Sequence, residues 1–328
     1  MKKSWLVTGG AGYIGSHVAR ALHDAQMHPV VVDDLSSGHR EFVSQEIPFV
    51  EGSILDTALL SRVMQEHAVV GVIHLAGFKY AGVSVERPLH TYTQNVSGTI
   101  SLLDAMAYNE VELIVFSSSA ATFGTPDVDL VTEQTPTHPE SPYGESKLIG
   151  EWLIADQARA VDLKHTSLRY FNVVGSGHDD LFDTSPHNLF PLVFNALIEG
   201  RTPRINGEDY NTPDGTCVRD YVHVQDLAHS HVAAARQLAT GVALEPVYNL
   251  GSGTGSSVRQ IMDAMARVTG IDFIPEIGPR RPGDPDRIVA TGEAASHDLD
   301  WQMRHSLDEM VASAWQARQG ATKTVKGQ

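Results

Sequence analysis

Short apolar runs rich in β-branched residues alternate along this chain with longer stretches of helical character. The apolar runs predict strands at 5–10, 29–34, 48–53, 69–77, 113–120, 165–172 and 247–253. Intervening helices are predicted at 17–25 and 98–109. Strands that are apolar throughout are buried on both faces, as in a parallel sheet covered by helices. The pattern therefore predicts the α/β class, with a doubly wound parallel sheet and right-handed crossovers.

The alternation of strands and helices breaks after residue 172. Residues 173–218 are rich in Gly, Asp, His and Pro, with helical patterns only at 189–200 and later at 256–270. We interpret these pieces as a smaller mixed α/β cap at the carboxyl ends of the strands, where open α/β sheets bind ligands. The predicted units are 1–172 plus about 219–252 for the sheet domain, about 173–218 plus 253–320 for the cap, and 321–328 as a flexible tail.

Bulk composition is that of a globular protein, with 42% hydrophobic and 20% charged residues. The longest apolar runs, such as 69–77, are too short to cross a bilayer. The first residues run directly into a strand and leave no room for a signal peptide. One cysteine, Cys217, excludes an internal disulfide and is typical of a reducing compartment. We therefore expect a cytoplasmic protein without a membrane partner.

Charge and histidine content exclude further classes of function. The formal net charge is −16 and basic residues form no run, which argues against a nucleic-acid partner. The 16 histidines are scattered without the spacing of metal ligands, so no metal is predicted. Such a protein can still bind anionic small molecules through a few arginines and helix N-termini.

A glycine-rich turn follows the first strand, in TGGAGYIGSHVARAL. Gly9, Gly10, Gly12 and Gly15 allow a tight turn and a close approach to a pyrophosphate at the start of a helix. Asp33 follows the second strand at about the place of the carboxylate that binds a ribose 2′-hydroxyl. Since a carboxylate repels a 2′-phosphate, the pattern predicts a Rossmann domain that binds NAD rather than NADP. The alternative is a purely structural turn.

The stretch SPYGESK places Tyr143 and Lys147 four residues apart, on one face of a helix. A lysine ammonium near a phenol lowers the tyrosine pKa and makes it a usable base near neutral pH. The alternative is a helix start with Ser141 as cap and Pro142 at the first position. Ser119 follows an apolar strand and is expected at the same edge of the sheet, beside the cofactor turn.

At this point the chain resembles a known family. TGGAGYIG, HLAG (74–77), RYFN (169–172) and the Ser119, Tyr143, Lys147 set resemble the extended short-chain dehydrogenase/reductase superfamily. Within it, HLAGFKYAGVSVERPL (74–89), DGTCVRDYVHVQDLA (214–228) and PRRPGD (279–284) are similar to the UDP-glucose 4-epimerases, which are NAD-dependent isomerases. The resemblance covers roughly residues 4–315.

The resemblance implies that the chain interconverts UDP-galactose and UDP-glucose by transient oxidation at sugar C4 with tightly bound NAD. In that reaction Tyr143 is the acid/base, Lys147 lowers the tyrosine pKa and binds the nicotinamide ribose, and Ser119 holds the 4-oxygen. The implied cofactor-binding positions are Gly9, Gly12, Tyr13, Ile14, Gly15, Asp33, Asp34, Ser53, Ile54, Leu75, Ala76, Gly77, Lys79, Asn95, Tyr143, Lys147 and Phe171.

The resemblance also implies a binding site for the UDP-hexose in the cap. Arg219 and Arg281 correspond to positions that clamp the diphosphate, and Asp284 to one that contacts ribose. The implied substrate-binding positions are Ser119, Tyr143, Asn172, Asn188, Leu189, Asn206, Arg219, Arg281, Asp284 and Ile288. By the same analogy the protein is expected to be a homodimer, through helices near 98–109 and 145–159.

The chain departs from the family pattern at three positions. Ser53 stands where an aspartate is usual, which puts an adenine contact in doubt, and Asn206 stands where an aromatic residue often faces the uracil. Ile288 is of intermediate size at a position thought to admit or exclude an N-acetyl group. A 4-epimerase acting on another UDP-sugar (N-acetylhexosamine, pentose or uronate) therefore stays open.

Two further alternatives are weighed against the epimerase. A nucleotide-sugar dehydratase needs an acidic residue beside the serine, and Ala120 and Ala121 follow Ser119 instead. A non-catalytic NAD-binding regulator has no need of a base, yet this chain keeps Tyr143 and Lys147. Both features favour a catalytic epimerase.

Overall fold

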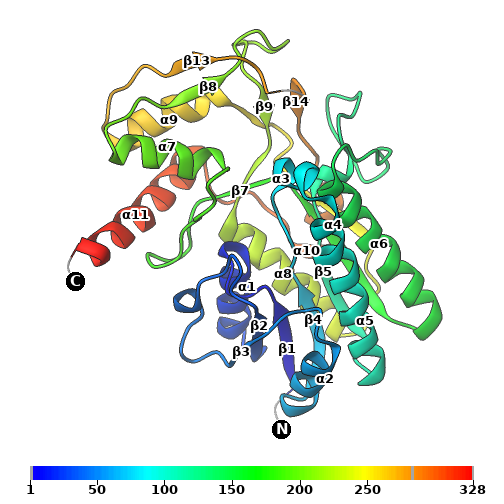
Figure 1. The fold of residues 1–328 in the computed structure, drawn as a ribbon. Coiled ribbons are helices and arrows are strands. Elements are labelled where there is room, and N and C mark those ends of the chain that lie inside the picture. Colours follow the sequence, from blue (N-terminus) through cyan, green and yellow to red (C-terminus); the bar gives the residue numbers. More distant parts are fainter. Residues whose placement is uncertain (1–2, 282–283, 327–328) are drawn as a thin grey trace.

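The computed structural model describes residues 3–281 and 284–326, and its centre is a seven-stranded parallel sheet (Figure 1). The strand order is β11-β6-β5-β4-β1-β2-β3. The strands are β1 (Ser4–Thr8), β2 (Pro29–Asp33), β3 (Phe49–Glu51), β4 (Val69–His74), β5 (Leu113–Ser117), β6 (Lys164–Tyr170) and β11 (Val247–Leu250). They are the seven predicted strands, each ending a few residues earlier than predicted because the polar or glycine residues beyond already belong to turns.

Helices cover both faces of the sheet, as the apolar strands require. On one face lie α1 (Tyr13–Asp24) and α8 (Val224–Ala239); on the other lie α2 (Thr57–Glu66), α5 (Gly98–Tyr108) and α6 (Pro142–Val161). Neighbouring residues of one strand serve the two cores, since successive side chains point to opposite faces. Val7 packs with the α1/α8 core and Leu6 with the α2/α5/α6 core.

The strand order places the functional edge of the sheet. From β1 the chain builds outward through β2 and β3, and then returns to add β4 on the opposite side. The carboxyl ends of β1 and β4 thus flank the point where the order reverses, and at such a point helices diverge and leave a crevice.

A smaller mixed α/β unit lies over the carboxyl ends of the strands (Figure 1). Its helices are α7 (Leu189–Ile198), α9 (Val258–Thr269) and α11 (Leu307–Lys326). Its short strands pair as β7 (Asn172–Val174) with β10 (Tyr221–His223), β9 (Val218–Arg219) with β12 (Ser256–Ser257) and β14 (Arg287–Ile288), and β8 (Arg204–Asn206) with β13 (Glu276–Gly278). Phe190, Phe194, Ile261 and Met310 belong to its separate core.

The remaining helices are short. They are α3 (Ala81–Glu86), α4 (Pro88–Tyr92), α10 (Glu293–Leu299) and single turns at Arg40–Phe42, Thr93–Ser97 and Ala120–Thr122. Although α10 falls in the range predicted for the cap, Ala295 and Leu299 pack into the α1/α8 core of the sheet. The domain bounds stay a prediction, with α10 on the side of the sheet.

The predicted tail, 321–328, overlaps the end of α11, and its flexibility stays a prediction. α11 continues to Lys326, because 321–326 contains neither proline nor glycine and nothing in the sequence stops the helix there. Residues 327–328 lie outside the described residues. Across 3–281 and 284–326, no helix has the length and apolar character that a membrane span needs.

Candidate active site

A cavity of about 880 Å³ lies between the carboxyl ends of the strands and the cap. Predicted residues from both units line it. They are Gly9, Gly12, Tyr13, Ile14, Gly15, Asp33, Asp34, Ile54, Leu75, Ala76, Gly77, Lys79, Tyr143, Lys147, Phe171, Asn172, Asn188, Leu189, Asn206, Arg219, Arg281 and Asp284. The structure therefore brings most of the predicted cofactor and substrate residues into one space.

The glycine turn has no room for side chains at Gly9, Gly10 and Gly15, and a Cβ on Gly10 would meet the Val31 side chain at 2.7 Å. Gly9 has a φ of +73°, and a Cβ on it would meet the Ala76 nitrogen at 2.7 Å. A Cβ on Gly15 would meet the Gly9 oxygen at 2.1 Å. Gly12 caps α1 without a side chain, so the backbone N–H groups of the first turn face the cavity uncovered. This is a cradle suited to a pyrophosphate.

Asp33 ends β2 as predicted and is held by the backbone around it. Its Oδ2 accepts a hydrogen bond from the Ala11 nitrogen at 3.0 Å, and its Oδ1 accepts one from the Leu35 nitrogen at 2.9 Å. Burial raises the pKa of this carboxyl, while these two bonds lower it. Since each carboxylate oxygen can accept a second bond, Asp33 can still bind ribose hydroxyls. The cradle and this carboxylate fit NAD.

Tyr143 and Lys147 lie on the first turns of α6, which starts as the sequence indicated. The Ser141 side chain accepts a hydrogen bond from the Gly144 nitrogen at 3.2 Å, and Pro142 occupies the first helical position. The helix start and the Tyr143–Lys147 pair are thus both present. In the sequence they stood as alternatives, but the two are compatible. The helix start at Ser141 and Pro142 sets where α6 begins, and so places Tyr143 and Lys147 at the cavity.

The expected action of Lys147 on the tyrosine pKa stays a prediction. The Lys147 ammonium donates a hydrogen bond to the Ser117 carbonyl at 2.8 Å and lies 6.0 Å from the centre of the Tyr143 ring. Burial raises the pKa of Tyr143, and the hydrogen bond with Ser119 opposes that rise. Burial also lowers the pKa of Lys147 to about 8. Desolvation is thus the largest influence on the pKa of each group.

Ser119 is not among the residues that line the cavity, although it lies next to Tyr143. It caps the turn at Ala120–Thr122, where its Oγ accepts a hydrogen bond from the Ala121 nitrogen at 3.1 Å. The same hydroxyl lies close enough to Tyr143 to lower the pKa of its phenol. Its predicted contact with the substrate oxygen stays a prediction.

Three other predicted residues do not line the cavity. The Asn95 amide is turned to the Phe78 backbone, at 2.6 and 3.0 Å, and so positions the segment beside Lys79. The Ser53 Oγ accepts a hydrogen bond from the Leu55 nitrogen at 3.2 Å. Its neighbour Ile54 does line the cavity. Ile288 packs in a small apolar cluster under the cap.

The cap supplies arginines and a helix N-terminus. Arg219 forms an ion pair with Asp284 at 3.1 Å, so the residue predicted to contact ribose orients one of the predicted diphosphate clamps. Asn188 caps α7 and donates to the Asp183 carboxylate at 2.7 Å. Asn172 donates to the Asp220 carbonyl at 3.0 Å. The motif around Arg281 includes 282–283, which lie outside the described residues.

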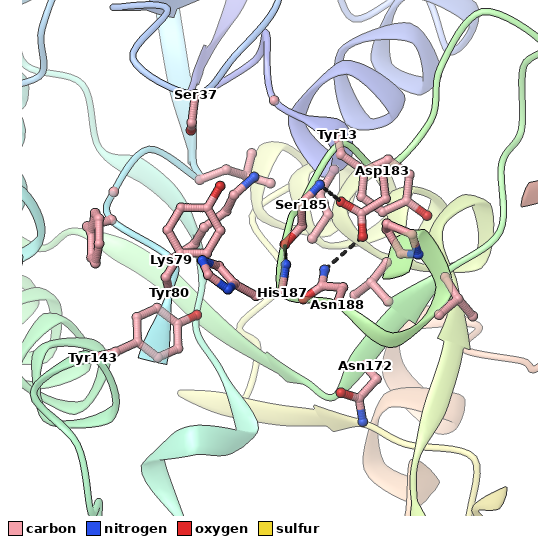
Figure 2. A pocket seen from close by; sticks show the side chains of 18 of the residues that line it. Tyr13, Ser37, Lys79, Tyr80, Tyr143, Asn172, Asp183, Ser185, His187 and Asn188 are labelled. Carbon is pink, nitrogen blue, oxygen red and sulfur yellow. Dashed lines mark hydrogen bonds between the residues drawn. The ribbon is translucent and has the colours of Figure 1, made fainter. Parts of the chain in front are cut away.

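Sequence reasoning assigned no role to the loop 175–187, which returns from the cap to the sheet domain. Arg20 of α1 pairs with Asp180 in this loop at 2.5 Å, and the His187 ring meets the Tyr80 ring edge-on at 5.0 Å. Figure 2 shows Tyr80 and His187 at the end of the cavity near Tyr143. Other unpredicted lining residues are Ser37, Phe78, Asp183, Ser185 and Tyr221. No periodicity marks these positions, and only their contacts reveal them.

Among the described residues, no group of three or more His, Cys, Asp or Glu side chains is placed to hold a metal ion.

Residues 5–251 match the NAD dependent epimerase/dehydratase family. The UDP-glucose 4-epimerase of Lactobacillus helveticus is 42% identical over 315 residues, which cover 94% of this chain and 95% of the relative.

Solved structures of similar proteins agree. The UDP-glucose 4-epimerase from Brucella ovis in complex with NAD has a TM-score of 0.91 and 40% identity, over 95% of this chain and 97% of that one. The Stenotrophomonas maltophila enzyme with NAD and formylated UDP-arabinopyranose has a TM-score of 0.93 and 37% identity, over 98% and 99%. The predicted resemblance is confirmed: this chain belongs to the NAD dependent epimerase/dehydratase family.

Proposed function

We propose that this chain is an NAD-dependent isomerase that interconverts UDP-galactose and UDP-glucose by transient oxidation at sugar C4. One observation carries the proposal. A half-buried tyrosine and a buried lysine of α6 share a single cavity with a dinucleotide cradle on one side and cap arginines on the other. The relatives described above, which are UDP-glucose 4-epimerases, support it.

The cofactor would be held by the Gly9–Gly15 turn and by Asp33. When bound, NAD supplies the hydride acceptor and donor for C4, together with a positive charge that favours a nearby phenolate. Tyr143 takes the proton of the 4-hydroxyl when hydride leaves C4, and returns it when hydride comes back on the other face of the sugar. Ser119 orients the phenol through their hydrogen bond.

The cap residues would bind the UDP moiety. Arg219 and Arg281 present guanidinium groups to the cavity, and guanidinium suits phosphate oxygens. Asn188 and Leu189 open α7, whose N-terminus favours an anion. Asn206, at the end of β8, would face the base. These roles keep the diphosphate fixed while the sugar presents either face to the cofactor.

We also propose a homodimer, formed through the helices that cover one face of the sheet. Large apolar side chains are exposed there although the protein is acidic: Leu89 of α4 is 81% exposed, Tyr108 of α5 77% and Trp152 of α6 57%. A second copy would remove this apolar surface from water. A cytoplasmic location remains a prediction from the sequence.

The test is made on purified protein given UDP-galactose without added NAD, with UDP-glucose formation followed. Tyr143→Phe removes the acid/base group. Tyr108→Phe is the matched control, because it removes only a hydroxyl on α5 and keeps the apolar ring in the proposed dimer surface. We expect product from the native protein and from Tyr108→Phe, and a loss of at least about 10²-fold in Tyr143→Phe.

Two outcomes would redirect the proposal. If the protein is silent until NAD is added, the cofactor is retained less tightly than proposed. If it stays silent with NAD present, UDP-galactose is the wrong substrate. UDP-N-acetylgalactosamine, run alongside, tests the alternative that the sequence left open at Ile288.

A further inference from the structure

The three serines at the end of β5 each make a different contact behind the active site. The Ser117 carbonyl accepts the hydrogen bond of the Lys147 ammonium, and the Ser117 Oγ lies 2.7 Å from His231 Nε2. The Ser118 hydroxyl donates to Glu151 Oε1 at 2.5 Å. The Ser119 side chain lies next to the Tyr143 phenol and lowers its pKa. The strand end that holds Ser119 and Lys147 is therefore tied to Glu151.

Glu151 is half of a buried ion pair. Its two carboxylate oxygens accept from Arg169 Nε at 2.9 Å and from Arg169 Nη2 at 2.6 Å, and both side chains are only 6% exposed. The guanidinium also lies over the Phe123 ring, at 4.9 Å. Burying two charges costs about as much desolvation as their attraction returns, so such a pair is a weak source of stability. The pair does fix the relative positions of these side chains, because three donor atoms must meet the two carboxylate oxygens of Glu151.

Glu151 also faces Lys147, one turn earlier on α6. Burial lowers the pKa of Lys147, and the Glu151 charge opposes that change. The other titratable groups around this ammonium are Tyr143 on α6, His74 on β4, Arg169 and Tyr170 on β6, and His231 on α8. Burial lowers the pKa of His74 to about 3 and that of His231 to about 4, so neither adds charge at pH 7.

We propose that Glu151 is a positioning residue for the reaction: with Arg169 and Ser118 it fixes the end of β5 beneath Ser119, and it supplies the negative charge that keeps Lys147 an ammonium. The inference rests on the proposed function, in which Lys147 is charged beside Tyr143 and binds the nicotinamide ribose. It assigns a purpose to a buried ion pair that touches neither cofactor nor substrate.

The test measures the titration of Lys147 directly, so it is independent of whether UDP-galactose is the substrate. The chain has seven lysines, few enough for each side-chain carbon to give a separate NMR signal in protein labelled with ¹³C-lysine. Lys147→Met assigns the signal. We expect its midpoint near pH 8 in the native protein, and lower by about one pH unit in Glu151→Gln.

Activity gives the second readout. If Lys147 must be charged, the alkaline limb of the activity profile should move to lower pH in Glu151→Gln by the same amount as the NMR midpoint. Glu151→Asp should restore both. Asp156→Asn removes one carboxylate from the exposed face of α6 and is the matched control, expected to change neither.

The proposal is overturned if Glu151→Gln leaves the Lys147 midpoint unchanged, or if activity falls equally at every pH, as for a purely structural residue. Glu151→Gln leaves Arg169 buried without its charge partner and can fail to fold. In that case Glu151→Gln with Arg169→Met is compared with Arg169→Met alone, because loss of the Arg169 guanidinium by itself relieves a repulsion on the Lys147 ammonium. The Lys147 midpoint is required to be lower in the double variant than in Arg169→Met.

Discussion

Gly12 and Gly15 belong to the same turn, yet alanine should affect different properties at the two positions. At Gly15 it should lower the stability of the fold, and at Gly12 it should weaken NAD binding. A Cβ on Gly15 would lie 2.1 Å from the Gly9 oxygen, whereas real Cβ contacts stay beyond 3.0 Å. The backbone of the turn must therefore move. A Cβ on Gly12 would meet only the Gly9 oxygen, at 3.4 Å, which is an ordinary contact. Gly12 instead leaves room for the cofactor.

The expected magnitudes follow from these distances. Overpacking at Gly15 costs about 1–3 kcal/mol, and the better helix propensity of alanine returns about 0.8 kcal/mol. We expect a net loss of up to about 2 kcal/mol, which lowers the melting temperature by up to about 3 °C without NAD present. Gly12→Ala should leave that temperature within about 1 °C but weaken NAD binding about 10- to 100-fold, since it holds the pyrophosphate away from the backbone.

The assay is a thermal melt of each variant with and without NAD, together with a fluorescence titration of NAD. Gly82→Ala is the control, because a Cβ there has nothing within 4 Å and the residue lies in α3. Equal destabilisation of Gly12→Ala and Gly15→Ala without NAD would refute the reasoning. Undiminished NAD affinity in Gly12→Ala would refute it too.

Three further predictions concern buried titratable groups. Asp33→Asn presents an amide donor to a backbone N–H, so NAD affinity in the same titration should fall about tenfold; unchanged affinity would contradict the assigned role. Lys147 has a folded pKa of about 8 against an ordinary 10.5, so the wild-type unfolding free energy should rise between these pH values. Lys147→Met should be the more stable protein at pH 7, by up to about 3 kcal/mol, and lose that advantage by pH 10.5. His74 and His231, buried and neutral, bind protons on unfolding, so stability should fall below pH 6.5 by up to about 1.4 kcal/mol per pH unit each; a double variant to glutamine should flatten melting temperature against pH, and equal slopes would contradict this.

Much of the fold follows from the sequence because burial on two faces leaves a strong local signal. The predicted strands coincide with the seven of the sheet, and the predicted helices at 17–25, 98–109, 189–200 and 256–270 overlap α1, α5, α7 and α9. The glycine turn is equally readable, since only glycine satisfies the close contacts at Gly9 and Gly15. In each case the physical constraint acts on one segment and its immediate neighbours.

The parts that were missed depend on contacts between distant segments. Loop 175–187 has no periodicity, so nothing in it indicates that His187 meets Tyr80 or that Asp180 meets Arg20. The same limit applies to Asn95. Its side chain satisfies the Phe78 backbone rather than the cavity, and that choice depends on where two loops come together.

The Tyr143–Lys147 spacing shows why proximity does not fix a pKa. Four residues on a helix place two side chains on one face, but the direction of each pKa change depends on burial and on the remaining partners. Here the ammonium is directed to the Ser117 carbonyl, and desolvation acts against the charged form of both groups. For Tyr143 to act as a base, positive charge must therefore be concentrated at this site. Glu151 opposes the loss of the Lys147 charge. A residue outside the cavity therefore helps to determine whether Tyr143, in the Tyr143–Lys147 pair that the sequence reveals, can act as a base.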